Sequence, residues 1–300
     1  MTFHRLNAGR KDRQNTYLND PESGAEMARL LDQDRTLTAS MGGLLPEWDQ
    51  GDITGLHDVL DIACGPGGWA QELAFSNPHL DVMGVDISQA MIEYAQMQVS
   101  TRRLQNVDFA VMDVTEPLDF MDNSFDLVNA RTMAGFMKKS AWPRVVGECV
   151  RVLRPGGILR LTETDHWGTT NSPAFATLMD LSYQAVWLDE HSFDPGRRTF
   201  GITPLLERFL REAGLAQIDQ RAYAVNFSSG ARAYQAMYQN FLVFFQLIQP
   251  FLLRMRNTLE DTGIPPKEEL ERLYEEMLLE MLKEDFAGIF YLLTVWGRKP

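Results

Sequence analysis

The chain has 300 residues, 45% of them hydrophobic and 23% charged, the ordinary balance of a globular protein with enough apolar material for a core. Its 41 acidic and 28 basic residues give a net charge of −13. This balance argues against nucleic acid as a partner, because a phosphate-binding face must be basic. No uncharged apolar run reaches the length of a membrane span, and no signal-peptide core follows Met1. We therefore expect a cytoplasmic protein with no membrane partner.

Cys64 and Cys149 are too few for a disulfide framework and match no zinc spacing. No set of His, Asp and Glu residues has a convincing ligand spacing either. The sequence therefore predicts free thiols and no metal.

The first predicted helix runs from Pro21 to Met41 and ends at Gly42 and Gly43. Apolar strands are then expected at 58–63, 81–86, 107–112, 125–130 and 157–163, with helices near 68–76, 88–101 and 142–153 between them. Strands alternating with helices at this spacing indicate βαβ units and a doubly wound parallel α/β sheet.

After residue 165 the pattern changes to helices at 172–189 and 203–213, a strand at 217–227, a helix-rich stretch at 231–284 and a last strand at 289–296. We divide the chain into an N-terminal helical lid (1–50), a core (51–170), a lid helix with the remainder of the core (171–230), a helical insertion (231–285) and a terminal strand (286–300). Aromatic and Met side chains at helical spacing in the later helices suit a pocket for a flat, hydrophobic molecule. Plain core, or the contact of a homodimer, is the more common explanation of such a pattern.

The segment Gly65-Pro66-Gly67-Gly68-Trp69-Ala70 follows an apolar strand and opens a helix. Glycine lets a backbone approach a ligand closely at such a turn. The segment satisfies G-x-G-x-x-G/A, and Asp86 follows at the spacing of a ribose-binding acid. By pattern alone the loop fits a nicotinamide dinucleotide as well as an adenosyl cofactor.

Asp61 lies at the end of the preceding strand, where a carboxylate would repel a pyrophosphate but attract the ammonium and sulfonium groups of S-adenosylmethionine. At about 4 Å in a partly screened site that preference is on the order of a few kcal/mol. Asp86 could accept from both ribose hydroxyls, and Asp113 from the adenine amino group, with Ile87 and Val114 on the ring faces. Each acid alone could be a helix or turn cap. Three acids at successive strand ends are harder to explain in that way.

These residues resemble the class I S-adenosylmethionine-dependent methyltransferases, over 59–68, 83–91, Asp113, 118–126 and 151–161. The resemblance implies a Rossmann-like doubly wound seven-stranded sheet with an antiparallel last strand, to which 288–300 is similar, plus helical lid insertions. Its nearest look-alikes are bacterial small-molecule methyltransferases of the quinone, terpenoid and natural-product kind. By position it implies S-adenosylmethionine as cofactor, bound by Asp61, Ala63, Cys64, Gly65, Gly67, Asp86, Ile87, Met91, Asp113, Val114, Ala130 and Arg131.

Methyl transfer from a sulfonium is an in-line displacement, so the protein mainly aligns the nucleophile with the methyl group. A base is needed only when the nucleophile's pKa lies well above the working pH. Glu163, Asp165 and His166 follow the fifth strand, and His166 is the first candidate because imidazole accepts a proton near neutral pH. A loop histidine bonded to backbone explains it equally well. His191 is a weaker candidate.

Tyr17 precedes the first helix. The resemblance implies that an N-terminal segment closes over the cofactor with an aromatic residue facing the methyl group. A tail tyrosine with no such role is the alternative.

We therefore expect an enzyme that methylates a small hydrophobic or aromatic acceptor and yields S-adenosylhomocysteine, as in secondary metabolism. An NAD-type Rossmann oxidoreductase and a non-catalytic S-adenosylmethionine-binding relative are the alternatives. The acceptor atom (O, N or C) stays open.

Overall fold

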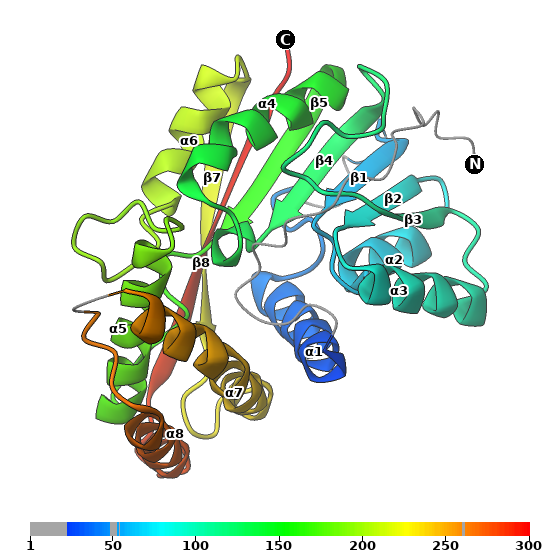
Figure 1. Ribbon diagram of the computed structural model, residues 1–300. Helices are drawn as coiled ribbons and strands as arrows, with labels where there is room; N and C mark the ends of the chain where they lie inside the picture. The colour runs from blue at the N-terminus through cyan, green and yellow to red at the C-terminus, as the bar shows by residue number, and fades with distance from the viewer. Residues whose placement is uncertain (1–22, 49–52, 54, 260–261) are drawn as a thin grey trace.

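The computed structural model describes residues 23–48, 53, 55–259 and 262–300. Tyr17 lies outside these residues. At the centre is an eight-stranded sheet with the order β3-β2-β1-β4-β5-β8-β6, and β7 pairs with nearly the whole length of β8, from Ile289 to Arg298 (Figure 1). The strands are β1 (Asp58–Ile62), β2 (Asp81–Asp86), β3 (Val107–Val111), β4 (Phe125–Arg131), β5 (Leu153–Glu163), β6 (Thr169–Thr170), β7 (Ala216–Asn226) and β8 (Gly288–Arg298).

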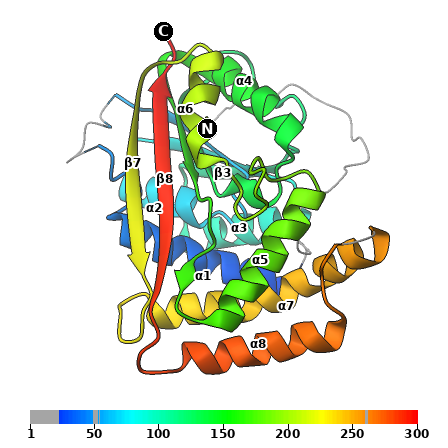
Figure 2. The same ribbon diagram turned by 90° about the vertical axis from the view of Figure 1, so that its left-hand side faces the viewer.

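β1 to β5 run parallel, and β8 runs antiparallel to β5, β6 and β7. The doubly wound sheet with an antiparallel last strand is thus confirmed. The predicted total of seven strands missed the two-residue β6, which is too short to leave a periodic signal. The long β7 and β8 lie side by side along the height of the molecule (Figure 2).

The helices divide into two groups (Figure 1). α2 (Gly68–Ser76), α3 (Gln89–Arg102), α4 (Trp142–Val152) and α6 (Thr203–Glu212) pack on the sheet. α1 (Gly24–Met41), α5 (Pro173–Leu188), α7 (Tyr234–Thr258) and α8 (Lys267–Met281) gather at one end of it, joined by contacts of α1 with α7 and of α5 with α7 and α8. Two short 3-10 helices, η1 (Met133–Gly135) and η2 (Lys139–Ala141), follow β4.

Among the described helices, α7 is the one that length and composition would allow to cross a membrane. Buried residues such as Phe241, Phe245 and Ile248 recur along it. Exposed polar residues such as Gln235, Gln239 and Gln246 occupy its other side. In this structure α7 is therefore a core helix, packed against α1, α5 and α8.

Asp165 serves the fold. Its Oδ1 accepts the N–H groups of Ile202 (2.7 Å) and Thr203 (3.1 Å), and its Oδ2 accepts the hydroxyl of Thr203. Since those residues begin α6, Asp165 satisfies the amides at that helix N-terminus. We therefore no longer count it among the candidate bases.

Candidate functional site

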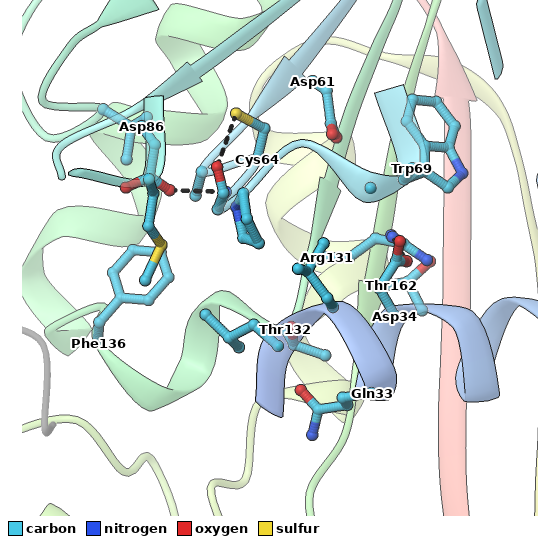
Figure 3. Close-up of a pocket in the computed structure, with 18 of the residues that line it drawn as sticks. Gln33, Asp34, Asp61, Cys64, Trp69, Asp86, Arg131, Thr132, Phe136 and Thr162 are labelled. Carbon is cyan, nitrogen blue, oxygen red and sulfur yellow. Dashed lines mark hydrogen bonds and ion pairs between the residues drawn. The ribbon is translucent and has the colours of Figure 1, made fainter. Parts of the chain in front are cut away.

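A cavity of about 140 Å³ opens beyond the carboxyl ends of β1, β2, β3 and β4, with α1 as its opposite wall (Figure 3). Open α/β sheets hold their ligands at this edge. The cavity brings together ten of the twelve residues that the sequence assigned to the cofactor: Asp61, Ala63, Cys64, Gly65, Asp86, Ile87, Met91, Asp113, Val114 and Arg131.

Gly67 and Ala130 do not line the cavity. Gly67 has a left-handed backbone (φ +78°), and a Cβ there would lie 2.5 Å from the ring of Phe109. Its glycine is thus required by packing against β3 as well as by the turn. Ala130 is fully buried within β4. Gly65 (φ +54°) does face the cavity, and a Cβ there would meet nothing closer than 3.8 Å.

Asp86 ties the end of β2 to the glycine loop. Its two oxygens accept the N–H groups of Gly65 (2.8 Å) and Ser88 (2.9 Å). Asp86 also lines the cavity, where its carboxylate can accept hydrogen bonds from a ligand. Asp113 accepts the N–H (2.9 Å) and hydroxyl (2.6 Å) of Thr115. Both acids serve a local turn and also line the cavity, so capping does not exclude a binding role.

Asp61 is the most buried acid of the cavity, with 4% of its surface exposed. Its Oδ1 accepts the amide of Asn129 at 2.7 Å. Burial raises the pKa of Asp61 to about 7, against the opposing effects of the Arg131 guanidinium and the Asn129 hydrogen bond.

The lining of the cavity is acidic overall. Asp34, Asp61, Asp86 and Asp113 contribute carboxylates, and among the lining residues Arg131 is the one basic side chain. Such a cavity favours a cationic ligand over a pyrophosphate.

The sequence assigned residues 1–50 to a helical lid but named no residue of α1 as part of the site. This helix lines the cavity with Leu30, Leu31, Gln33, Asp34, Leu37 and Met41. Asp34 forms an ion pair with Arg131, which also donates to the hydroxyl of Thr38 (3.1 Å), so α1 is fixed by charge to the end of β4. Figure 3 shows Asp34 and Arg131 together on the α1 side of the cavity. No sequence motif marks an acid such as Asp34, because its role depends on how α1 docks.

A second cavity of about 60 Å³ adjoins the first. Leu30, Gln33 and Thr132 line both. Five of its other eleven lining residues are aromatic, four are polar or charged and two are small: Arg29, Ala134, Gly135, Glu163, Thr164, Trp167, Phe200, Asn240, Phe241, Phe244 and Phe290.

Of the predicted catalytic residues, Glu163 lies in this second cavity. It is 1% exposed and accepts the N–H groups of Met133 (2.6 Å) and Ala134 (3.3 Å) of η1. Burial raises the pKa of Glu163 to about 8 despite these two bonds. A carboxyl group with such a pKa can exchange a proton near neutral pH.

His166 lines neither cavity. Its backbone N–H and carbonyl engage the hydroxyl of Thr164, and its ring packs edge-on against Tyr183 at 5.7 Å. His191 is buried, with its Nδ1 3.5 Å from a carboxylate oxygen of Asp189, and it also lies outside both linings.

Trp167 is the centre of the aromatic wall. The centroid of its ring lies 4.7 Å from those of Phe200 and Phe244, and its backbone N–H donates to the hydroxyl of Tyr183 (2.6 Å). The second cavity therefore combines an aromatic wall with polar side chains, as sites for small molecules usually do.

A polar cluster at the α1–α7 contact borders the aromatic wall. Arg29 donates to the buried Glu26 (2.6 Å) and to Asn240 (2.9 Å). The cluster satisfies these buried groups and fastens α1 to α7.

Comparisons with known proteins agree with this geometry. A model described as a methyltransferase domain matches residues 59–157. A demethylmenaquinone methyltransferase of Geobacillus kaustophilus is 32% identical over 180 residues, which cover 55% of this chain and 73% of the relative. The methyltransferase pytC of Aspergillus terreus is 27% identical over 253 residues, covering 81% of this chain and 71% of the relative.

Two solved structures share the fold. The YcgJ protein of Bacillus subtilis matches with a TM-score of 0.52 and 17% identity, covering 85% of this chain and 97% of that one. Phosphoethanolamine N-methyltransferase 2 of Haemonchus contortus, solved with phosphomonomethylethanolamine and S-adenosylhomocysteine, matches with a TM-score of 0.51 and 18% identity, covering 93% of this chain and 57% of that one.

Proposed function

We propose an acceptor class and residue roles for this chain, which belongs to the class I S-adenosylmethionine-dependent methyltransferases. It is an enzyme whose cofactor is S-adenosylmethionine and whose relatives methylate small molecules. Neither the NAD-type oxidoreductase nor the non-catalytic relative is favoured by these matches.

The first cavity fits this cofactor by charge and by its apolar walls. In our proposal Asp86 holds the ribose, Asp113 the adenine amino group and Asp61 the ammonium group, with Ile87 and Val114 against the ring. When bound, the cofactor supplies an electrophilic methyl group and a neutral thioether as leaving group. The excess of carboxylates in the lining stabilises the positive charge that binding brings into a buried site.

The acceptor, in our proposal, is a flat aromatic or quinonoid molecule with an ionisable hydroxyl group or activated ring carbon. One observation carries this: the second cavity shares Leu30, Gln33 and Thr132 with the first, and aromatic rings form its walls. The adjoining cavities would put acceptor and methyl donor side by side. The demethylmenaquinone methyltransferases act, by their names, on a quinone, which supports the same class.

The side chains of the second cavity align the acceptor, exclude water and move one proton. Trp167 and Phe244 pack edge-on against each other and offer one apolar wall on which the acceptor ring can lie, which limits the orientations of the nucleophile. Glu163, once ionised, accepts the proton that the nucleophile loses; because burial raises the pKa of Glu163 to about 8, we expect turnover to rise with pH up to that value. His166 lines neither cavity, so its variant serves as the control for Glu163 in the assay below. The cytoplasmic location, the homodimer, the place in secondary metabolism and the role of Tyr17 stay predictions.

A labelled-methyl assay against a panel of quinols, phenols, terpenoids and amines tests the acceptor class. We expect transfer to quinols or phenols, and a Glu163→Gln variant should lose about 100-fold in turnover while binding S-adenosylhomocysteine normally. His166→Ala, measured beside it, should lose much less. Transfer to aliphatic amines alone, or a larger loss in the histidine variant, would contradict the proposal.

A further inference from the structure

The register of the central strands places three polar residues in a row beneath the cofactor cavity. Asp61 of β1 is paired with Asn129 of β4, and Asn129 is paired with Arg160 of β5. Residues opposite each other in neighbouring strands point to the same face of a sheet, so their side chains meet. They are 4%, 0% and 1% exposed respectively.

The row is continuous in hydrogen bonds. Arg160 donates to the Asn129 oxygen (2.7 Å), and the Asn129 amide donates to Asp61 (2.7 Å). At the other end of the row, Arg160 donates two hydrogen bonds of 3.0 Å to Glu47. The hydroxyl of Tyr223 also donates to Glu47 (2.7 Å). The Glu47 side chain is 0% exposed. A single chain of contacts thus links the cofactor cavity to the segment that follows α1.

Arg160 determines the orientation of the Asn129 amide group. A guanidinium only donates, so the oxygen of Asn129 must face Arg160 and its NH2 group must face Asp61. A donor held in that place favours the ionised carboxylate. Although burial opposes it, the Arg160 guanidinium keeps the pKa of Glu47 below its usual value, so the far end of the row stays charged. Asn129 therefore cannot turn its amide over without leaving Arg160 short of an acceptor.

We propose that Asn129 and Arg160 are positioning residues for the methyl-donor site, which keep the Asp61 carboxylate ionised and aimed at the cofactor's ammonium group. This inference rests on the role of Asp61 in the proposed function. Glu47 anchors the row by fixing Arg160. The other groups around Asp61 are the Arg131 and Asp34 pair, from β4 and α1, and the Cys64 thiol of the glycine loop.

The ionised and protonated forms of Asp61 are close in free energy at neutral pH, so the hydrogen bond from Asn129 can decide which form is present. Burial raises the pKa of Asp61 to about 7, so a small loss of support leaves the carboxyl protonated at neutral pH. A neutral Asp61 would lose its attraction for an ammonium group.

The test is the titration of Asp61 in the ligand-free protein, followed by carboxyl carbon NMR and assigned with Asp61→Asn. Asn129→Leu removes the donor, and we expect the Asp61 midpoint to rise by about one pH unit. The dissociation constant for S-adenosylhomocysteine should weaken about tenfold at pH 7, the scale of one hydrogen bond to a charged group, and recover by pH 9. An unchanged midpoint overturns the proposal.

Arg160 needs a paired design, because removing it alone leaves Glu47 charged and buried. Arg160→Met with Glu47→Leu removes both charges, and Asn129 is then free to turn. We expect the same upward shift of the midpoint, whereas Arg160→Lys, which still donates, should restore most of the native value. A midpoint that stays native in the double variant contradicts the proposal.

Asn106→Leu is the matched control for lost stability. Asn106 donates to the carbonyls of Ala74, Asn77 and Leu80 and lies outside the row. It should lower the free energy of unfolding and leave the Asp61 midpoint unchanged. Asp61→Asn separates the two proposals: if it binds S-adenosylhomocysteine normally, the assigned role of Asp61 fails, whatever Asn129→Leu does to the titration.

Discussion

The two cavities meet at α1 but are built in different ways. The acidic cavity takes most of its chemistry from residues 61–131, at the ends of successive parallel strands. The aromatic cavity collects residues as far apart as Arg29 and Phe290. The first is specified by short local patterns, and the second by the docking of α1 and α7 on the sheet. Substitutions in the first cavity should therefore change backbone stability and cofactor affinity. Substitutions in the second should change acceptor binding and proton transfer.

Gly65 and Gly67 sharpen this comparison within a single loop. Both have left-handed backbones, but a Cβ at Gly67 would overlap Phe109 while one at Gly65 would make only ordinary van der Waals contacts, the nearest at 3.8 Å. Gly67→Ala should lower the free energy of unfolding by roughly 2–5 kcal/mol, and Gly65→Ala by about 1–2 kcal/mol. Urea denaturation measures both. Equal losses would mean that the contact with Phe109 relaxes freely.

Asp86→Ala should affect binding rather than folding. It removes the acid proposed to hold the ribose, so the affinity for S-adenosylhomocysteine should fall by roughly 1.5–3 kcal/mol, the range for a lost charged hydrogen bond. Isothermal titration calorimetry gives the value. Trp167→Phe, in the other cavity, is the control and should bind S-adenosylhomocysteine as the native protein does. Native affinity in Asp86→Ala would remove this residue from the site.

On stability, Glu163→Gln should have a modest effect, and the one that depends most on pH. The folded protein holds the Glu163 proton up to about pH 8, whereas the unfolded chain releases it near its ordinary value of 4.5. The free energy of unfolding contributed by Glu163 therefore falls as pH rises through that window. The variant should be more stable than the native protein by about 1–2 kcal/mol at pH 9 and should lose that advantage near pH 5.

Thermal unfolding of both proteins across this range measures the difference, in which the titration of Asp61 largely cancels. A difference that grows toward acid pH would show that Glu163 is ionised in the folded protein at neutral pH.

Ten of the residues predicted to bind the cofactor line the acidic cavity because the predicted acids follow successive strands. The carboxyl ends of parallel strands meet at one edge, so Asp61, Asp86 and Asp113 had to converge. The same rule placed Glu163 near the site, although it did not separate Glu163 from Asp165 and His166. That separation depends on where α6 begins and on which way the chain turns after β5.

The aromatic cavity could not be predicted, because helical spacing shows which face of a helix is apolar and not what that face meets. Plain core or a dimer contact was the more common explanation of Phe241 and Phe244, and in the structure they line the second cavity. The row from Asp61 to Glu47 was equally hidden. It needs the pairing register of three strands, and no local pattern encodes that register.

The sharing of α1 by both cavities limits how such an enzyme can change its acceptor. Leu30 and Gln33 face both ligands, so substitution there alters cofactor and acceptor binding at once. Phe200 and Phe290 line the aromatic cavity alone. A laboratory library aimed at new acceptors should therefore vary these two positions first and keep α1 constant.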